Sequence, residues 1–82
     1  MEDKLIKSAW NSYLARVIPA DAPIVQVTES RRAFYAGAQA LLGTLMARLD
    51  PDKEPTEADL VMMDSIKAEL DQFARDVQAG KA

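Results

Sequence analysis

The sequence predicts an all-α fold, either a small three-helix bundle or a helical hairpin with an additional N-terminal helix, assembled as a homodimer. Three segments repeat apolar residues at helical spacing, and two connections that each contain two prolines separate them. The second segment contains an uncharged run from Ala33 to Ala47, which is about four turns of helix. A helix that is apolar nearly all round must be covered nearly all round, so we expect part of its cover to come from another subunit.

The first predicted helix, residues 3–17, carries an apolar stripe made of Leu5, Ile6, Ala9, Trp10, Tyr13, Leu14 and Val17. Pro19 ends this helix, because a proline disfavours helical conformation in the residue before it. The IVQV segment, residues 24–27, is ambiguous. It is either an extended strap that packs Ile24 and Val27 into the core, or the first turn of the second helix, capped by Asp21.

The second helix is predicted over residues 28–49, with Thr28 as its N-cap. The third is predicted over residues 56–79, capped by Thr56 and ended by Gly80. Its apolar residues form a heptad seam of Met63, Ile66, Leu70, Phe73 and Val77. The connection between these helices contains no apolar residue other than proline, which indicates an exposed turn.

The uncharged helix has three different faces. One is a stripe of small residues, Ala33, Gly37, Ala40, Thr44 and Ala47. A second, bulkier stripe is predicted to fill the core and consists of Phe34, Ala38, Leu41 or Leu42, Leu45 and Leu49. The third face is also uncharged and consists of Tyr35, Gln39, Leu42 and Met46.

The small stripe predicts a close helix crossing. A glycine inside a helix costs about 1 kcal/mol relative to alanine, and close approach of another backbone usually offsets that cost. The helix contains two glycines, Gly37 and Gly43. Either Trp10 or Phe73 of the same chain lies over them, or the helix of a second copy does. The third uncharged face favours the dimer.

Composition limits the classes of function. The chain has 82 residues, which predicts a single helical domain over 1–82, and its net charge of −3 argues against broad binding to nucleic acid or anionic lipid. The uncharged run is shorter than the roughly 20 apolar residues that a bilayer requires. We therefore expect a cytoplasmic protein that has no membrane association and acts on a protein partner or on itself.

The chemistry-bearing residues argue against an enzyme. The chain contains neither histidine nor cysteine, which excludes Ser-His-Asp triads, Cys-His pairs, thiolate metal sites and histidine-based metal motifs. The DPDKE segment begins like a calcium loop, but Pro55 stands where that loop needs glycine and Val61 where it needs glutamate. The glycines are too scattered for a phosphate loop. The sequence thus predicts no catalytic residue, cofactor or metal.

The polar residues that invite a functional interpretation are Arg31, Arg32 and Tyr35. Both arginines fall in the first turn of the predicted second helix, where the dipole disfavours cations. With Tyr35 they could hold a phosphate or an acidic partner. The alternative, which we favour, is that one of them pairs with Glu29 or with an acid of the third helix. Asp71 and Arg75 have the spacing of a helix-surface ion pair.

The order of Trp10, IPADAP at Ile18–Pro23, ESRRAFYAGAQALL at Glu29–Leu42 and EADLVMMDSIKAELDQFARDV from Glu57 resembles small uncharacterised proteins carried by bacteriophages and prophages. The resemblance implies a bacterial or phage setting and assigns no activity. Our hypothesis is a non-enzymatic helical protein that acts by self-association and protein–protein interaction. The alternative is a small nucleic-acid-associated regulator that uses the two arginines.

Overall fold

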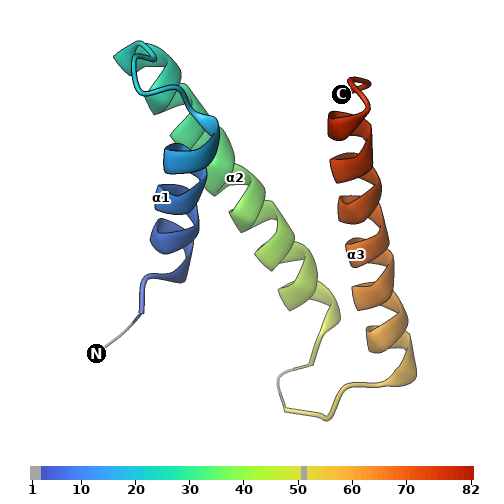
Figure 1. Cartoon of the computed structure of the whole chain (residues 1–82). Coiled ribbons are helices and arrows are strands. Elements are labelled where there is room, and N and C mark those ends of the chain that lie inside the picture. The colour runs from blue at the N-terminus through green and yellow to red at the C-terminus, as the bar shows by residue number, and fades with distance from the viewer. Residues whose placement is uncertain (1–2, 51) are drawn as a thin grey trace. The chain divides into compact units, whose positions relative to one another are not determined.

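The structure is a computed structural model that describes residues 3–50 and 52–82, and these residues are helical without any strand, which confirms the all-α prediction. The helices are α1 (Leu5–Val17), α2 (Ile24–Arg48) and α3 (Glu57–Gln78) (Figure 1). The chain divides into two compact units, Met1–Leu45 and Met46–Ala82. The first unit is a helical hairpin of α1 and most of α2, and the second contains α3.

The turn between α1 and α2 is short because proline stands at both of its ends. Ile18 ends α1 in extended conformation immediately before Pro19, as the sequence predicted. The backbone N–H of Ala22 then donates to the carbonyl of Pro19 at 3.0 Å. The carbonyl of Pro23 accepts from the N–H of Val27 at 3.1 Å, so α2 starts directly after the second proline.

The predicted start of α2 at Thr28 is therefore wrong, and so is the extended strap over residues 24–27, whereas the alternative that these residues form the first turn of the second helix is confirmed. Proline is well suited to the start of a helix, because the first helical N–H groups have no partner inside the helix. Once the helix has started there, it continues through the β-branched residues Ile24, Val25 and Val27. Each of them costs only a few tenths of a kcal/mol, roughly the difference in helix propensity from alanine. Ile24 is 83% exposed instead of entering the core, while Val27 is half-buried.

The core of the hairpin is an aromatic cluster around Trp10. Trp10 is 4% exposed and is the one side chain classed as buried among the described residues. Its ring lies 5.5 Å from that of Phe34 in an edge-to-face arrangement and 6.0 Å from that of Tyr13, and the Tyr13 and Phe34 rings are 5.6 Å apart. Centroid distances of this size are typical of favourable aromatic pairs. This cluster holds α1 against α2.

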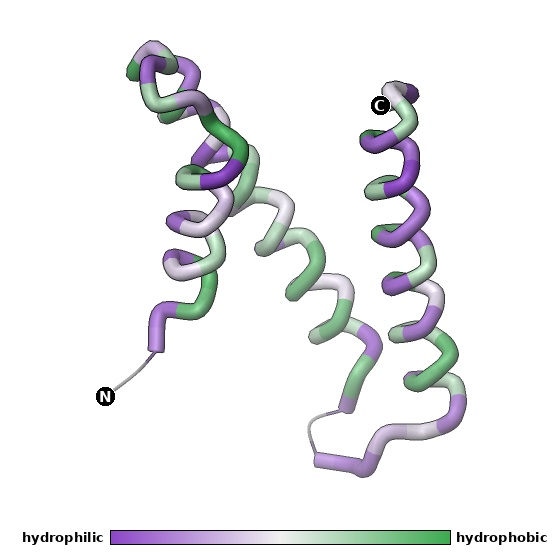
Figure 2. The backbone as a smooth tube through the Cα atoms, in the orientation of Figure 1, coloured by the Kyte–Doolittle hydropathy of each residue, from purple (hydrophilic) through white to green (hydrophobic). Residues whose placement is uncertain are grey.

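The faces of α2 differ in burial as well as in side-chain size. Much of the bulky stripe is half-buried, namely Phe34, Ala38, Leu45 and Leu49, whereas Leu41 and Leu42 are exposed. Figure 2 shows α2 as mostly green and white beyond its contact with α1, while purple segments recur along α3. The uncharged part of α2 therefore has one half-buried face, and its exposed faces carry no charged side chain.

Both ends of α3 are set by local hydrogen bonds that the sequence predicted. The N–H of Asp59 donates to Thr56 Oγ1 at 3.1 Å, and the N–H of Thr56 donates to Asp59 Oδ2 at 2.9 Å, which is a capping box. At the other end Gly80 has a φ of 75°, and the N–H of Lys81 donates to the carbonyl of Asp76 at 2.8 Å. This is a Schellman ending, in which glycine adopts the left-handed conformation without strain.

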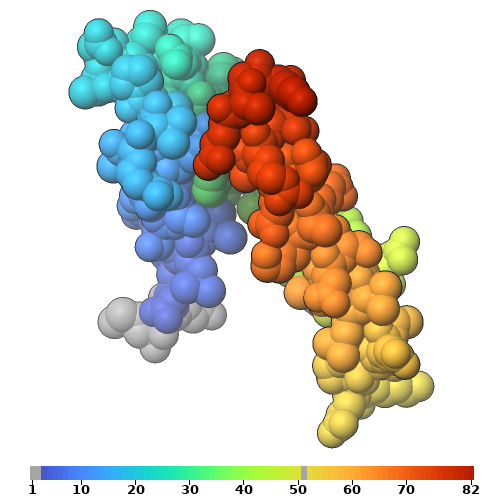
Figure 3. Space-filling model, turned by 45° about the vertical axis from the view of Figure 1, so that its right-hand side comes forward, coloured from blue at the N-terminus to red at the C-terminus, as the bar shows by residue number. Residues whose placement is uncertain are grey.

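The polar surface of α3 has one close ion pair. Lys67 Nζ lies 2.6 Å from Asp71 Oδ2, and this hydrogen bond and the charge of Lys67 lower the pKa of Asp71. The same contact raises the pKa of Lys67. Arg75 donates a hydrogen bond to Gln72 at 2.9 Å, and Asp71 pairs with Lys67. The predicted ion pair between Asp71 and Arg75 is therefore wrong. Figure 3 shows the surface of α3, coloured orange to red, in space-filling form.

Candidate functional site

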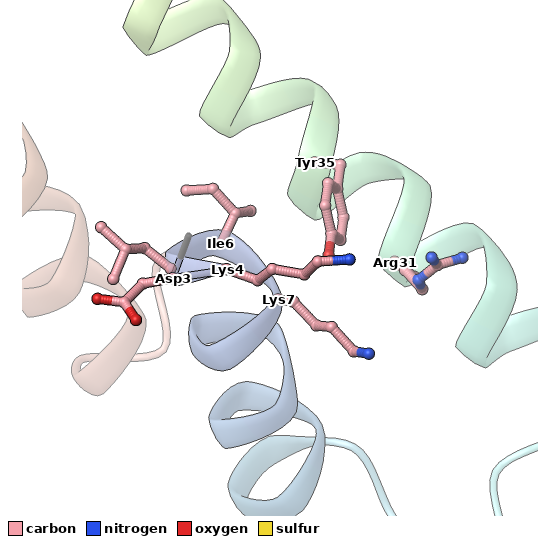
Figure 4. A pocket seen from close by; sticks show the side chains of 7 residues that line it. Asp3, Lys4, Ile6, Lys7, Arg31 and Tyr35 are labelled. Carbon is pink, nitrogen blue, oxygen red and sulfur yellow. The ribbon is translucent and has the colours of Figure 1, made fainter. Parts of the chain in front are cut away.

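A basic pocket lies where the N-terminal end of α1 meets α2. Its volume is about 670 Å³, and Figure 4 shows Lys4 and Lys7 extending from α1 toward the side on which Arg31 and Tyr35 of α2 lie. Among the described residues of its lining, Asp3 is the single acid, and it points to the opposite side in that view. Three cations against one carboxylate make this a local positive patch in a chain whose net charge is −3.

The backbone adds to the positive potential of this pocket. Lys4 occupies the N-cap of α1 without a side-chain hydrogen bond to the helix, and the first turn contains Lys7 and no acid. The N-terminal end of a helix carries a partial positive charge that favours anions, so lysines there are electrostatically unfavourable. Arg31 is held with its guanidinium carbon 5.4 Å from the Tyr35 ring centroid, a cation–π contact. The arrangement is suited to an anionic group.

An apolar groove adjoins the basic pocket and shares Ile6 and Tyr35 with it. The groove has a volume of about 340 Å³, and the rest of its lining is Ala38, Gln39 and Leu42 of α2. These residues include most of the third uncharged face that the sequence analysis singled out. Leu42 is 58% exposed in this groove. A short apolar channel with cations at one end can take a side chain that is apolar and flanked by acids.

The structure separates the two arginines of the predicted polar site. Because α2 begins at Ile24, neither arginine is in the first turn, and the argument that the dipole disfavours them there is wrong. Arg32 Nη1 lies 3.2 Å from Glu29 Oε1, which confirms the predicted pairing with that acid. Arg31 instead lines the basic pocket with Tyr35. Arg32 is thus paired with an acid of its own helix, and only Arg31 belongs to the pocket lining.

The predicted interface stripe is exposed. All five of its residues, Ala33, Gly37, Ala40, Thr44 and Ala47, are exposed. A Cβ atom built on Gly37 or Gly43 would meet nothing within 4 Å, so of the alternatives left open, the one in which Trp10 of the same chain lies over the glycines is wrong. Trp10 packs on Phe34 instead, because α1 contacts α2 at the bulky stripe of α2. The hydroxyl of Thr44 donates to the carbonyl of Ala40 at 3.0 Å, which leaves the stripe without an unsatisfied side-chain donor.

In the second unit, α3 presents a surface that combines apolar and acidic side chains. A shallow hollow of about 480 Å³ is lined by Leu70 and Phe73 together with Glu69, Gln72 and Asp76. Phe73 is 60% exposed. Over its length α3 carries six carboxylates and two cations, a net charge of −4. It is therefore an acidic amphipathic helix.

Sequence reasoning did not identify Ile6, Lys4 and Lys7 as members of the site. The short turn could have indicated them, because it makes α1 and α2 antiparallel neighbours. The start of α1 then lies near the middle of α2. The register could not be derived, because the predicted start of α2 was four residues late.

The remaining observations are negative. None of the described helices is long and apolar enough to cross a membrane. Within residues 3–50 and 52–82, no group of three or more acidic side chains is arranged to hold a metal ion. Comparisons of the chain with protein-family models, with curated proteins and with solved structures find no match.

Proposed function

We propose that this chain is a non-enzymatic cytoplasmic helical protein that acts by self-association and by binding a protein partner, in the bacterial or phage setting that its sequence resemblance implies. The observation that carries the proposal is the exposed, uncharged surface of α2, on which an apolar groove lies next to a cluster of cations. Interfaces are recognised by such apolar patches with a polar rim.

Energetics support the proposal. Fully burying a leucine-sized side chain contributes about 1.5–3 kcal/mol, and in the hairpin Trp10 is the one described side chain that is buried. Leu5, Val17 and Leu42 of the same unit are each more than half exposed. Covering such residues with a second copy would stabilise both chains, because a small domain has little stability from its own core.

The test is the molar mass in solution over a wide concentration range, by sedimentation equilibrium. We expect a reversible monomer–dimer transition, and a monomer at every concentration would refute self-association. Leu42→Glu should shift the transition to higher concentration, while Val25→Glu, which places the same charge at an exposed position of α2, should not.

A second pair of variants tests the small stripe separately. Gly37→Leu should leave the helix content of the monomer unchanged, because its Cβ has open space around it. If the stripe is an interface, this variant should weaken the dimer, and Gly37→Ala should weaken it less. Unchanged association would show that no close crossing occurs at this glycine.

The cluster of Lys4, Lys7 and Arg31 is the observation that favours the second candidate, a nucleic-acid-associated regulator. That function predicts binding to labelled single- or double-stranded oligonucleotides that weakens steeply with salt. Replacing Arg31 and Arg32 together by alanine should reduce the binding. Absence of binding at low salt would exclude this function.

A further inference from the structure

We propose that the apolar groove of the hairpin receives helix α3 of a second copy of this chain, with Phe73 entering the groove and Glu69 and Asp76 facing the cations of the basic pocket. This inference rests on the proposed self-association and names the surfaces that carry it. The groove consists of Ile6, Tyr35, Ala38, Gln39 and Leu42, and its basic rim consists of Lys4, Lys7 and Arg31.

Charge complementarity is the first argument. The basic rim contains three cations, and among the described residues none of them forms an ion pair. On α3, Asp71 is already paired with Lys67, whereas Glu69 and Asp76 flank the exposed Phe73. Glu69 and Asp76 are seven residues apart, so they share one side of the helix next to Phe73 and can face cations that border the groove on one side.

The placement of these charges on their own helices is the second argument. The lysines of the rim lie at the N-cap (Lys4) and in the first turn (Lys7) of α1, where a helix favours acids. Asp76 occupies the last turn of α3, where a helix favours cations. Each charge is therefore placed against the local preference of its helix, and pairing across an interface would offset both costs.

The apolar surfaces agree in kind. The groove offers about 340 Å³ between two helices, and the exposed Phe73 and Leu70 are spaced three residues apart on one face of α3. An amphipathic helix that lies in an apolar groove uses anchors at this spacing. Aromatic anchors in such grooves contribute a large part of the binding free energy.

Symmetry closes the assembly. Each copy has one groove and one α3, so two copies exchange α3 helices through a two-fold axis and form the same contact twice. The exchange leaves no groove open and therefore stops at a dimer. A one-way contact would instead continue from copy to copy into larger oligomers.

The experiment uses two charge-reversal variants of the full chain. The rim variant carries Lys4→Glu and Lys7→Glu, and the α3 variant carries Glu69→Lys and Asp76→Lys. The rim substitutions, and Asp76→Lys on α3, place a charge that suits its helix end, so lost helix content is not expected and circular dichroism verifies it. Each variant alone should raise the dimer dissociation constant by about tenfold or more, because like charges then meet at the contact.

Mixing the two variants is the decisive step. In a mixed dimer the acidic groove of the rim variant meets the basic α3 of the other chain, and the second contact is wild-type. An equimolar mixture should therefore regain dimers with close to the wild-type dissociation constant. Matched controls with the same change in charge are Lys53→Glu with Lys81→Glu, and Asp52→Lys with Glu54→Lys, and these should leave association unchanged.

The outcomes separate this inference from the proposed function. If the wild-type chain is monomeric at all concentrations, both are wrong. If it dimerises but the charge reversals have no more effect than their controls, the self-association stands and this inference is overturned. If the variants weaken association and their mixture does not restore it, exchange of α3 between copies is likewise overturned.

Discussion

Replacing Trp10 by alanine should remove a large part of the stability of the helical hairpin. Trp10 is 4% exposed, and truncation of a buried tryptophan costs about 3–5 kcal/mol. That range includes the loss of ring contacts with Phe34 at 5.5 Å and Tyr13 at 6.0 Å, each worth about 0.5–1.5 kcal/mol beyond burial. A chain of 82 residues has a total stability of about 4–12 kcal/mol, so this single truncation should remove a quarter or more of it.

Urea unfolding followed by far-ultraviolet circular dichroism, at one fixed protein concentration, measures this loss. The control is Ile24→Ala, because Ile24 is 83% exposed and its truncation should cost about 0.5 kcal/mol or less. Phe34→Ala provides a second measurement, since Trp10 remains as the single tryptophan and its emission should shift to the red as its ring becomes hydrated. Equal losses for Trp10→Ala and Ile24→Ala would refute the assignment of the core.

Three further predictions concern α3. Thr56→Ala should destabilise its first turn by about 1 kcal/mol, whereas Thr56→Ser should retain the capping box, as amide hydrogen exchange would report. Gly80→Ala should cost about 1 kcal/mol, because a φ of 75° strains a residue with a Cβ atom; an unchanged urea midpoint would contradict this. The contact with Lys67 lowers the pKa of Asp71 below its ordinary 3.8 in the folded chain. Its stabilising contribution is therefore present above that pH and lost as pH falls through the lowered value, so acid titration of helix content should be shallower for Asp71→Asn.

The ends of α3 were predicted correctly because their signals are local. Thr56 bonds to a residue three positions away, and Gly80 ends the helix through its own backbone conformation. The start of α2 was predicted wrongly because two local signals compete there. Thr28 is a good N-cap, yet Pro23 already provides a helix start one turn earlier. Thr28 therefore becomes an interior residue of the helix that starts after Pro23.

The candidate site was predicted only in part for a different reason. Arg31 and Tyr35 were identified from their chemistry, and the third face of α2 from its lack of charge. Lys4 and Ile6 lie about thirty residues away in the chain, and only the packing of α1 on α2 brings them beside Tyr35. No spacing rule within one helix reports on such a contact.

The sequence by itself determined the helices, their stops at Ile18 and Gly80, and a second helix without charge from Ala33 to Ala47, since these properties follow from residue type and from neighbours within one or two turns. The tertiary structure decided which face of that helix is covered. The aromatic cluster places α1 against the bulky stripe at Phe34, because that contact removes the large apolar ring of Trp10 from water. The small stripe therefore stays exposed, as do Ile6 and Leu42 of the groove, and the lysines at the start of α1 come to lie beside Arg31.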